Sequence, residues 1–307
     1  MTWDVPLTNF LTVTLPGGYV DRSGAVYQDV ELTPLTGREE ELLASYQQSQ
    51  STTLMAKVLQ RCIQRIGPIS PVPNDLTSRL LIADRQYLLL KLRELTLGDF
   101  IHVTFHCPWS NCGKKIMVSF STHDIPVTES TDKGPTYTLE LSPEAAFAGD
   151  RDEVYREVVF RLPDGSDQEM LAPVASQDEM RSQVLLLQRC IQRIGPLQNP
   201  DEKTIGRLSP LARQEVEQRM ESVAPRVELM MESTCPECGR DYAAPFDVQR
   251  FFLDELRTSK DVLYREVHYL AFHYHWSERE IMDMPRQKRR TYIEILSSEI
   301  EKLNDVA

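Results

Sequence analysis

The chain has 307 residues, enough for two or three domains with a sizeable core. Its formal net charge of -12 argues against binding to nucleic acid or to anionic membranes, which requires a positive face. The sequence also lacks an apolar run near the ~20 residues that span a bilayer, and its start lacks the regions of a signal peptide, so we expect a cytoplasmic protein.

Two β-segments are predicted near the start of the chain. Residues 10–15 are rich in β-branched and apolar side chains, and residues 26–32 alternate like a return strand. Pro16-Gly17-Gly18 lies between the two segments and is a turn signal, so we expect the chain to reverse there.

A similar order is found in the second half of the chain. Residues 158–162 form a strand candidate, Pro163-Asp164-Gly165 is a turn signal, and Met170-Leu171 starts the return segment. Both halves then reach a Leu-x-Pro sequence, at Leu32-Thr33-Pro34 and at Leu171-Ala172-Pro173. This alignment gives the first half eleven extra residues before the next shared sequence. Eleven residues are close to three helical turns, so the apolar face of a helix could survive such an insertion.

A helix is expected after Leu-x-Pro in each half. Thr36 with Glu39, and Ser176 with Glu179, fit the capping box, in which a hydroxyl and a carboxylate satisfy two exposed backbone donors. These boxes predict where each helix begins.

The end of each predicted helix carries an identical sequence. The ten residues Leu59–Pro68, LQRCIQRIGP, recur letter for letter from Leu187 to Pro196, an offset of 128. The same offset carries Cys107-Pro108 onto Cys235-Pro236. In the first copy the apolar positions follow helical spacing; they are Leu59, Cys62, Ile63 and Ile66, with Gly67 as the helix end. We interpret the chain as an internal duplication.

The polar face of the repeated run is identical in both copies, although the flanking sequences have diverged. Its arginines are Arg61, Arg65, Arg189 and Arg193. Either these side chains pair with acidic residues within the fold, or they contact another subunit, which makes them candidates for partner binding or self-association. Cys62 and Cys190 lie on the apolar face and are expected to pack in the core.

A second helix follows in each copy and leads to a pair of cysteines. These helices are predicted at residues 80–97 and 211–223. Alternating apolar residues flank each cysteine pair and predict a β-hairpin with the cysteines near its tip. The four cysteines are Cys107, Cys112, Cys235 and Cys238.

Each cysteine pair is typical of a zinc knuckle, in which a following glycine lets backbone N–H groups approach the sulfurs. One knuckle supplies two ligands and a structural site needs four, so we expect both knuckles to share one structural zinc ion. The 122 residues between Cys112 and Cys235 add little to the free-energy cost of closing this site, because that cost grows only logarithmically with loop length. Zinc binding can exceed it. The alternatives are cysteines left from an ancestral site and redox chemistry at Cys235 and Cys238. A redox-active Cys-x-x-Cys pair starts a helix, whose N-terminus lowers the pKa of the thiol. Gly239 and the alternating residues nearby predict a hairpin instead, which disfavours redox chemistry.

The remaining segments complete an α+β fold of two diverged repeats, each with a β-hairpin, helices and a zinc-knuckle hairpin. Residues 1–127 are assigned to repeat one and its knuckle, and residues 151–247 to repeat two and its knuckle. Residues 128–150 form a linker, with an edge strand at 137–141. Residues 248–307 form a helical C-terminal segment that has no counterpart in repeat one.

Aromatic side chains concentrate in the C-terminal segment. Trp276 lies near Tyr269 and Tyr274 in the sequence, and large aromatic residues are both ordinary core residues and frequent contacts at interfaces. Packing explains the cluster most simply, and Trp276 is the candidate for partner binding. Ser277 with Glu280 is a further capping box.

Three features carry a family resemblance: DRQYLLLKLRELTLGD at residues 84–99, the two Cys-Pro…Cys-Gly knuckles, and HYLAFHYHWSEREI at residues 268–281. Together they resemble the T-even bacteriophage baseplate protein family, which also occurs in phage-tail-like contractile injection systems. The resemblance implies a component of a contractile tail, either a baseplate hub subunit or a factor that assembles the hub. Its partners would be other baseplate or tail proteins.

The residues themselves give no sign of an enzyme. The sequence has no Gly-rich phosphate loop, no His-Glu-x-x-His and no nucleophile elbow. We therefore predict a non-enzymatic protein. The alternative from another class is a zinc-ribbon nucleic-acid-binding protein, which the acidic balance disfavours, and a dithiol oxidoreductase is third.

Overall fold

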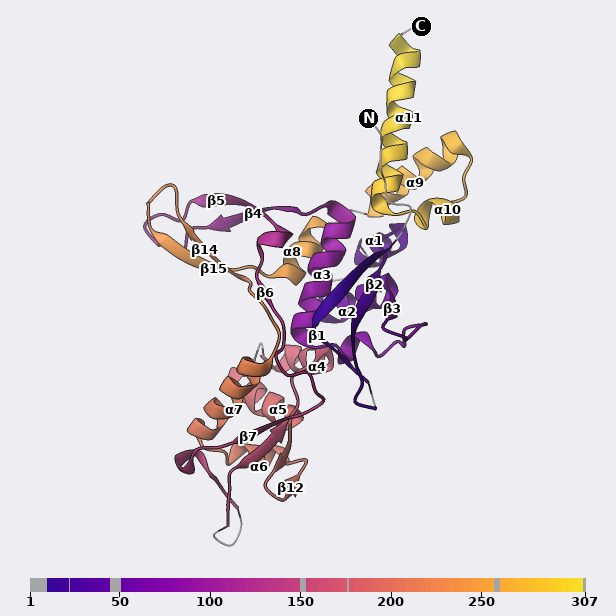
Figure 1. The fold of residues 1–307 in the computed structure, drawn as a ribbon. Coiled ribbons are helices and arrows are strands. Elements are labelled where there is room, and N and C mark those ends of the chain that lie inside the picture. The colour runs from indigo at the N-terminus through magenta and orange to yellow at the C-terminus, as the bar shows by residue number, and fades with distance from the viewer. Residues whose placement is uncertain are drawn as a thin grey trace.

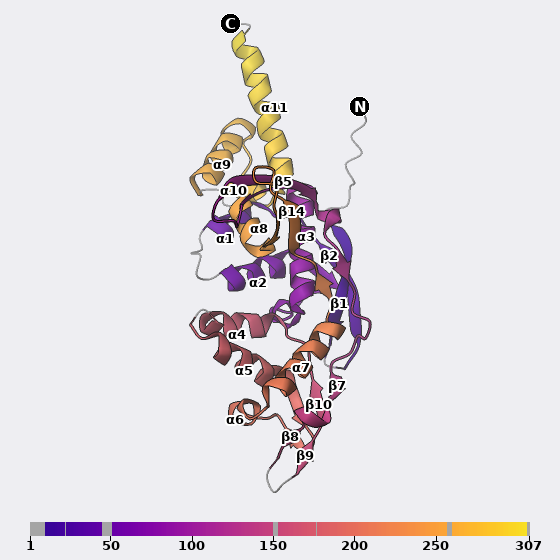
Figure 2. The same ribbon diagram turned by 90° about the vertical axis from the view of Figure 1, so that its left-hand side faces the viewer.

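Figures 1 and 2 show the fold in a computed structural model. The described residues are 10–21, 23–44, 51–149, 153–175, 177–256 and 260–305. Helices and strands are mixed, as expected for the α+β class. Two units of sheet and helix lie in a row, an arm of β-hairpins projects from their side, and the C-terminal helices lie at the end opposite the second unit. Ser176, predicted to cap a helix, lies outside the described residues.

Unit one is a three-stranded antiparallel sheet with three helices. The strands are β1 (Leu11–Val20), β2 (Val26–Leu32) and β3 (Ile63–Ile66), in the order β1-β2-β3. The helices are α1 (Gly37–Ala44), α2 (Ser51–Cys62) and α3 (Ile82–Leu97), with a 3-10 turn at Thr77–Arg79. Apolar side chains from both layers form one core, in which Leu15, Val30 and Leu59 are fully buried.

The predicted turn at Pro16-Gly17-Gly18 is wrong, because β1 continues through these residues with a local shift in register. The buried carboxylate of Asp84, on α3, accepts a hydrogen bond from the Gly17 N–H at 2.8 Å. This contact holds the irregular strand against the helix. The chain reverses a few residues later, where the Asp21 carboxylate accepts a hydrogen bond from the Ala25 N–H at 3.0 Å.

The repeated run is only partly helical, which corrects the prediction of a helix to its end. Helix α2 stops at Cys62, and the next four residues form β3, which pairs with β2. The second copy changes at the same point, from α5 (Glu179–Cys190) to β11 (Ile191–Ile194). The apolar spacing fits a helix, but pairing with the central strand buries Ile63 and Ile66 in the core and overrides the local pattern.

Unit two contains a four-stranded antiparallel sheet in the order β12-β11-β10-β7. Its other strands are β7 (Tyr137–Glu140), β10 (Glu157–Phe160), β12 (Leu197–Gln198) and the small hairpin of β8 (Phe147–Ala148) and β9 (Val154–Tyr155). Its other helices are α4 (Gly165–Ala175), α6 (Glu202–Gly206) and α7 (Pro210–Val223), with a 3-10 turn at Pro143–Ala145. It has a core of its own around Phe160 and Val216. The edge strand predicted near residue 137 is present as β7.

The predicted return strand at Met170-Leu171 is wrong, because these residues lie in α4. Helix α4 begins at Gly165 after Asp164, as α1 begins at Gly37 after Thr36, and these positions are 128 apart. The Leu-x-Pro alignment and its eleven-residue insertion are therefore also wrong. Pro163-Asp164-Gly165 was interpreted as a turn between strands. The same residue types also occur where a helix begins, and here α4 begins at Gly165.

The arm consists of two β-hairpins that pack on each other, and both hairpins were predicted (Figure 1). They are β4 (Phe100–His106) with β5 (Lys115–Ser121), and β14 (Met230–Thr234) with β15 (Asp241–Pro245). A 3-10 turn at Thr122–Asp124 follows the first hairpin. At the base of the arm, β6 (Val127–Thr128) pairs with β13 (Arg226–Val227), and we call this pairing the neck.

Helix α8 (Val248–Glu255) follows the arm and packs into the core of unit one. Its Phe252 is fully buried. The carboxylate of Glu255 accepts two hydrogen bonds from the Arg93 guanidinium, at 3.0 and 2.9 Å. The first eight residues of the predicted C-terminal segment thus complete the core of unit one.

Three helices end the described chain: α9 (Lys260–Tyr274), α10 (Glu278–Met282) and α11 (Arg286–Asp305). They form a small core of their own, and the predicted capping box of Ser277 and Glu280 begins α10. The group docks on α1 through Arg289, whose guanidinium donates to Glu40 at 2.7 Å and to Glu266 at 2.9 Å.

Candidate metal centre

The four cysteines meet where the two hairpins of the arm pack together. Their Sγ atoms all lie within 4.8 Å of one another. Across the hairpins, Cys107 and Cys238 place their Sγ atoms 3.8 Å apart, and Cys112 and Cys235 place theirs 3.9 Å apart. A tetrahedral ion with metal–sulfur bonds of about 2.3 Å separates its sulfur atoms by about 3.8 Å. The cluster therefore has the dimensions of a closed four-sulfur site and could hold a metal ion.

Each cysteine turn depends on the glycine that follows its second cysteine. Gly113 and Gly239 have φ values of 58° and 68°, in the left-handed region that favours glycine. The Gly239 N–H donates to the Cys235 carbonyl at 2.8 Å, and the Gly113 N–H donates to the Trp109 carbonyl at 3.1 Å. These tight turns bring both sulfurs of a pair to the same side of their hairpin.

The surroundings of the thiols affect their ionisation in opposite ways. Hydrogen bonds from the backbone of Cys238 and Glu237 lower the pKa of the Cys235 thiol to about 7, although burial opposes the shift. Burial raises the pKa of the Cys107 thiol to about 12. Metal ligation requires thiolates, so a bound cation would offset this burial cost at Cys107.

The redox alternative expects Cys235 at the start of a helix, where the helix N-terminus would stabilise its thiolate. The structure places this residue between strands β14 and β15, in a hairpin turn. All four sulfurs also face one another, instead of one pair facing a substrate. The geometry favours a metal site over a dithiol redox centre.

Two side chains that sequence reasoning missed join one cysteine turn to the other. The Trp109 indole N–H donates to the Asp241 carbonyl at 3.2 Å. The Arg240 guanidinium lies over the Trp109 ring, 5.2 Å from its centroid, and donates to the Asn111 side chain at 3.1 Å. The sequence did contain a signal for this contact: Trp109 lies inside one cysteine pair and Arg240 lies just after the other, and arginine often stacks on tryptophan.

The four arginines of the repeated runs form ion pairs within the chain. The pairs are Arg61 with Glu39, Arg65 with Glu31, Arg189 with Asp167 and Arg193 with Glu157. Internal acidic partners, one of the two alternatives from the sequence, are therefore present. About half of the side-chain surface of Arg61 and Arg65 stays exposed, at 49% and 48%, so contact with another protein remains a prediction.

Trp276 lies in the sequence between α9 and α10. These C-terminal helices form the end of the molecule away from unit two (Figure 1). Its ring stacks on Tyr274, with centroids 4.5 Å apart, and meets Tyr292 edge to face at 4.9 Å. The side chain is half-buried in the small C-terminal core. Packing thus accounts for much of its surface, and its role in partner binding remains a prediction.

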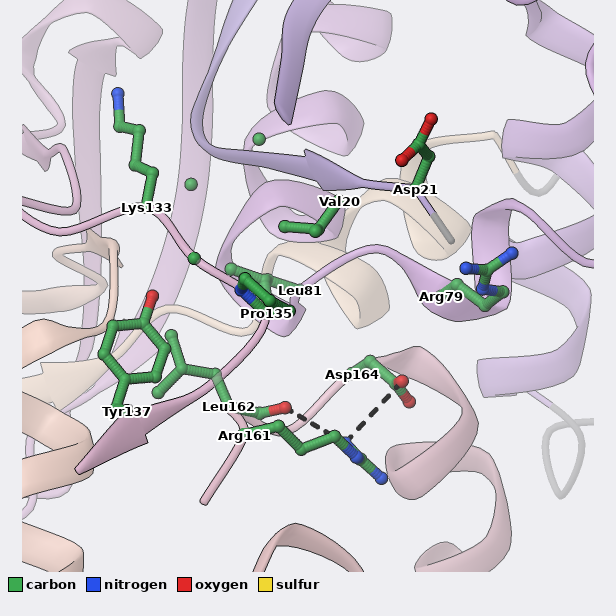
Figure 3. Close-up of a pocket in the computed structure, with 13 residues that line it drawn as sticks. Val20, Asp21, Arg79, Leu81, Lys133, Pro135, Tyr137, Arg161, Leu162 and Asp164 are labelled. Atoms are coloured by element: carbon green, nitrogen blue, oxygen red, sulfur yellow. Dashed lines mark hydrogen bonds and ion pairs between the residues drawn. The ribbon is translucent and has the colours of Figure 1, made fainter. Parts of the chain in front are cut away.

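A polar cavity of about 270 Å³ lies between units one and two (Figure 3). Arg161 donates to the Leu162 carbonyl at 3.0 Å and lies 3.7 Å from the Asp164 carboxylate. Asp21, Arg79 and Lys133 also line the cavity. Side chains of both charges share the wall of this cavity.

A family model described as T4 bacteriophage base plate protein matches residues 11–253. A second model, described as a family of unknown function (DUF6760), matches residues 256–307. Searches of curated proteins and of solved structures found no match. Within the described ranges, none of the helices is both long and apolar enough to cross a membrane.

Proposed function

Because the chain belongs to the T4 bacteriophage base plate protein family, we propose that it is a non-enzymatic component of a contractile, phage-tail-like particle. It acts in the hub region of the baseplate, as a subunit or as a factor that assembles the hub, and binds other baseplate or tail proteins. The observation that carries this proposal is the family match, which covers both units and the arm. The four-cysteine cluster supports it, because a closed site of this kind is typical of structural metals.

The metal in this proposal is a single structural zinc ion held by Cys107, Cys112, Cys235 and Cys238. Four thiolates in a tetrahedron are the usual ligand set of structural zinc, and the cross-hairpin sulfur distances of 3.8 and 3.9 Å fit it. The ion would join two hairpins that are far apart in the sequence. Its role is to stabilise the arm.

We also propose that the chain arose by duplication, with one cysteine hairpin at the end of each copy. The sheets support this, because β1-β2-β3 and β7-β10-β11 have the same antiparallel order. Side-chain contacts recur at the offset of 128 as well. Arg79 lies over the Tyr19 ring at 5.2 Å, and Arg207 lies over the Phe147 ring at 5.4 Å.

The domain plan follows from the duplication, with two boundaries adjusted. Strand β7 lies in the predicted linker 128–150 but pairs with β10, which favours placing it with repeat two. Helix α8 packs in the core of unit one, and the second family match begins at residue 256. We therefore assign residues 256–307 to the C-terminal segment, and propose that this segment and Trp276 contact the tail partner.

Metal analysis of the purified protein tests the shared site. We expect one zinc ion per chain. Cys107→Ser and Cys238→Ser should each release that same ion, although they alter different hairpins, and each should cost several kcal/mol because metal binding contributes to folding. Cys190→Ala, a buried cysteine outside the cluster, should keep the ion. Two ions per chain, or none after mild purification, would contradict the shared site.

Assembly of the tail particle tests the function. We expect deletion of the gene to stop formation of complete particles, and the wild-type protein to restore them. Mass spectrometry of purified particles then separates a resident subunit from an assembly factor. If particles form normally without the protein, and it captures no tail protein when used as bait, the proposed function is wrong.

A further inference from the structure

An open polar cavity of about 380 Å³ lies on unit one, where β2 leads into α1. Its wall includes Thr33, Thr36, Glu39, Arg61, Gln64 and Asp283. We propose that this cavity binds the guanidinium group of an arginine side chain that a partner protein presents. The inference rests on a comparison with unit two and depends on neither the metal centre nor the tail-particle function.

The equivalent place in unit two is filled by a guanidinium group. Arg161 donates two parallel hydrogen bonds to the Asp167 carboxylate, at 2.6 and 2.8 Å, and a third to the Leu162 carbonyl at 3.0 Å. The Asp167 side chain is fully buried. Paired hydrogen bonds of this kind are the strong form of arginine–carboxylate recognition.

Thr33 stands in unit one where Arg161 stands in unit two. The Thr33 N–H donates to the Cys62 carbonyl at 2.9 Å, and the Arg161 N–H donates to the Cys190 carbonyl at 2.9 Å. The two backbones therefore leave the sheet in the same way at this position. Threonine supplies no cation, so unit one has the recess without the arginine that occupies it in unit two.

The carboxylate that would receive a guanidinium is present in unit one as Glu39. It is buried, with 8% of its surface exposed. One oxygen, Oε2, accepts hydrogen bonds from the N–H and hydroxyl of Thr36 at 3.0 and 2.6 Å. The other, Oε1, lies 3.7 Å from the Arg61 guanidinium, too far for a hydrogen bond. This oxygen can accept a further donor from a ligand.

The nearby cations do not exclude a guanidinium ligand. In unit two, Asp167 binds Arg189 and Arg161 at once, so a carboxylate in this position serves two cations. Arg38, which also lines the unit-one cavity, is already bound to Asp283 at 2.8 Å. We expect an arginine and not a lysine, because Arg161 in unit two shows that a planar guanidinium group fits this place and can donate both to the carboxylate and to a main-chain carbonyl.

Titration of the full-length protein with N-acetyl-arginine amide, followed by heteronuclear NMR, tests the proposal. The backbone signals of Thr36 and Glu39 should shift, and N-acetyl-lysine amide should shift them far less. Thr33→Arg places a tethered guanidinium in the cavity and should abolish the shifts. Glu39→Gln removes the acceptor charge and should weaken binding by about tenfold or more.

Glu31→Gln is the matched control, because Glu31 is an acid paired with Arg65 outside the cavity. This variant should bind the probe like the wild type. Equal binding by the wild type and Glu39→Gln would overturn the proposal, as would an absence of shifts at Thr36 and Glu39. A preference for N-acetyl-aspartate amide would also overturn it, and would make the cavity an anion site.

Discussion

At the scale of single residues, Asp84 is a buried acid whose surroundings favour its neutral form. Its Oδ1 accepts the Gly17 N–H, whereas its Oδ2 has no hydrogen-bond partner within the described part of the chain. Burial raises the pKa of Asp84 to about 7, although the Gly17 and Gly18 N–H groups and Lys133 oppose the shift. The folded protein therefore keeps a proton that the unfolded chain releases near pH 3.8.

This difference predicts how stability changes with pH. Because the folded pKa is the higher one, the contribution is fully present below about 3.8 and is lost as pH rises through about 7. Asp84→Asn mimics the protonated acid and should remove this decline. Relative to the wild type, its free energy of unfolding should rise by about 2 to 3 kcal/mol between about pH 5 and about pH 8. Urea unfolding at both pH values measures the change, and parallel pH profiles would contradict the prediction.

A second residue-level prediction concerns the buried charges that dock the C-terminal helices. Arg289 is 0% exposed and Glu40 is 1% exposed, and their hydrogen bond of 2.7 Å is the shortest ion pair that either makes among the described residues. Arg289→Met should cost about 3 to 5 kcal/mol, because it leaves the buried Glu40 with Arg286, at 3.9 Å, as its remaining cation among the described residues. Limited proteolysis should then release the C-terminal segment. The double variant Glu40→Gln, Arg289→Met removes both charges and should recover most of the loss; if it is no more stable, the charge pair is not the cause.

Residue-level prediction from sequence succeeded where the signal is local. Each cysteine turn lies within a few residues of chain, so its spacing and glycine predicted the cluster that the fold brings together. Internal acidic partners of the arginines were one of two alternatives, but the acids themselves were not identified, because pairs such as Arg189 with Asp167 join distant positions. The offset of 128 was an unused signal, because it places an acid at both Glu39 and Asp167.

At the scale of elements, local patterns predicted the hairpins of the arm but not the elements that tertiary contacts decide. The alternation of apolar and polar residues correctly predicted both cysteine hairpins. Ile63 and Ile66 follow helical spacing, yet they form β3 because β2 offers pairing and burial. Pro16-Gly17-Gly18 carries a turn signal, yet it stays in β1 because the distant Asp84 binds the Gly17 backbone.

Helix α8 gives an element-level prediction about truncation. A chain ending at Leu256 should stay soluble and keep the proposed metal ion, because α8 and its buried Phe252 complete the core of unit one. A chain ending at Asp247 lacks this helix and should aggregate or melt at a much lower temperature. Circular dichroism melting and metal content compare the two. Equal melting temperatures would show that α8 adds nothing to the core.

At the scale of the whole molecule, the repeated run predicted two related units but not their placement. Nothing in the sequence pattern of either unit indicates that they lie in a row, or that both cysteine hairpins leave from the same side (Figures 1 and 2). That placement depends on contacts between the units, such as the hydrogen bond from the Gly165 N–H to the Leu80 carbonyl at 3.0 Å. Such contacts join segments that local spacing cannot connect.

Because the chain enters and leaves unit two through the neck, unit two could be removed or replaced as a whole. Thr128 and Arg226 face each other in the pairing of β6 with β13, so the chain departs for unit two and comes back at one point. The remaining polypeptide would be a continuous fold if a short turn bridged that point. Replacing residues 129–225 by Asn-Gly, which suits a tight hairpin, should therefore leave a folded protein that keeps the proposed metal ion. Loss of the metal from this miniature would mean that unit two holds the arm in shape. If the miniature folds, insertions and replacements at this point would change the length and surface of the protein without any change to the four-cysteine cluster.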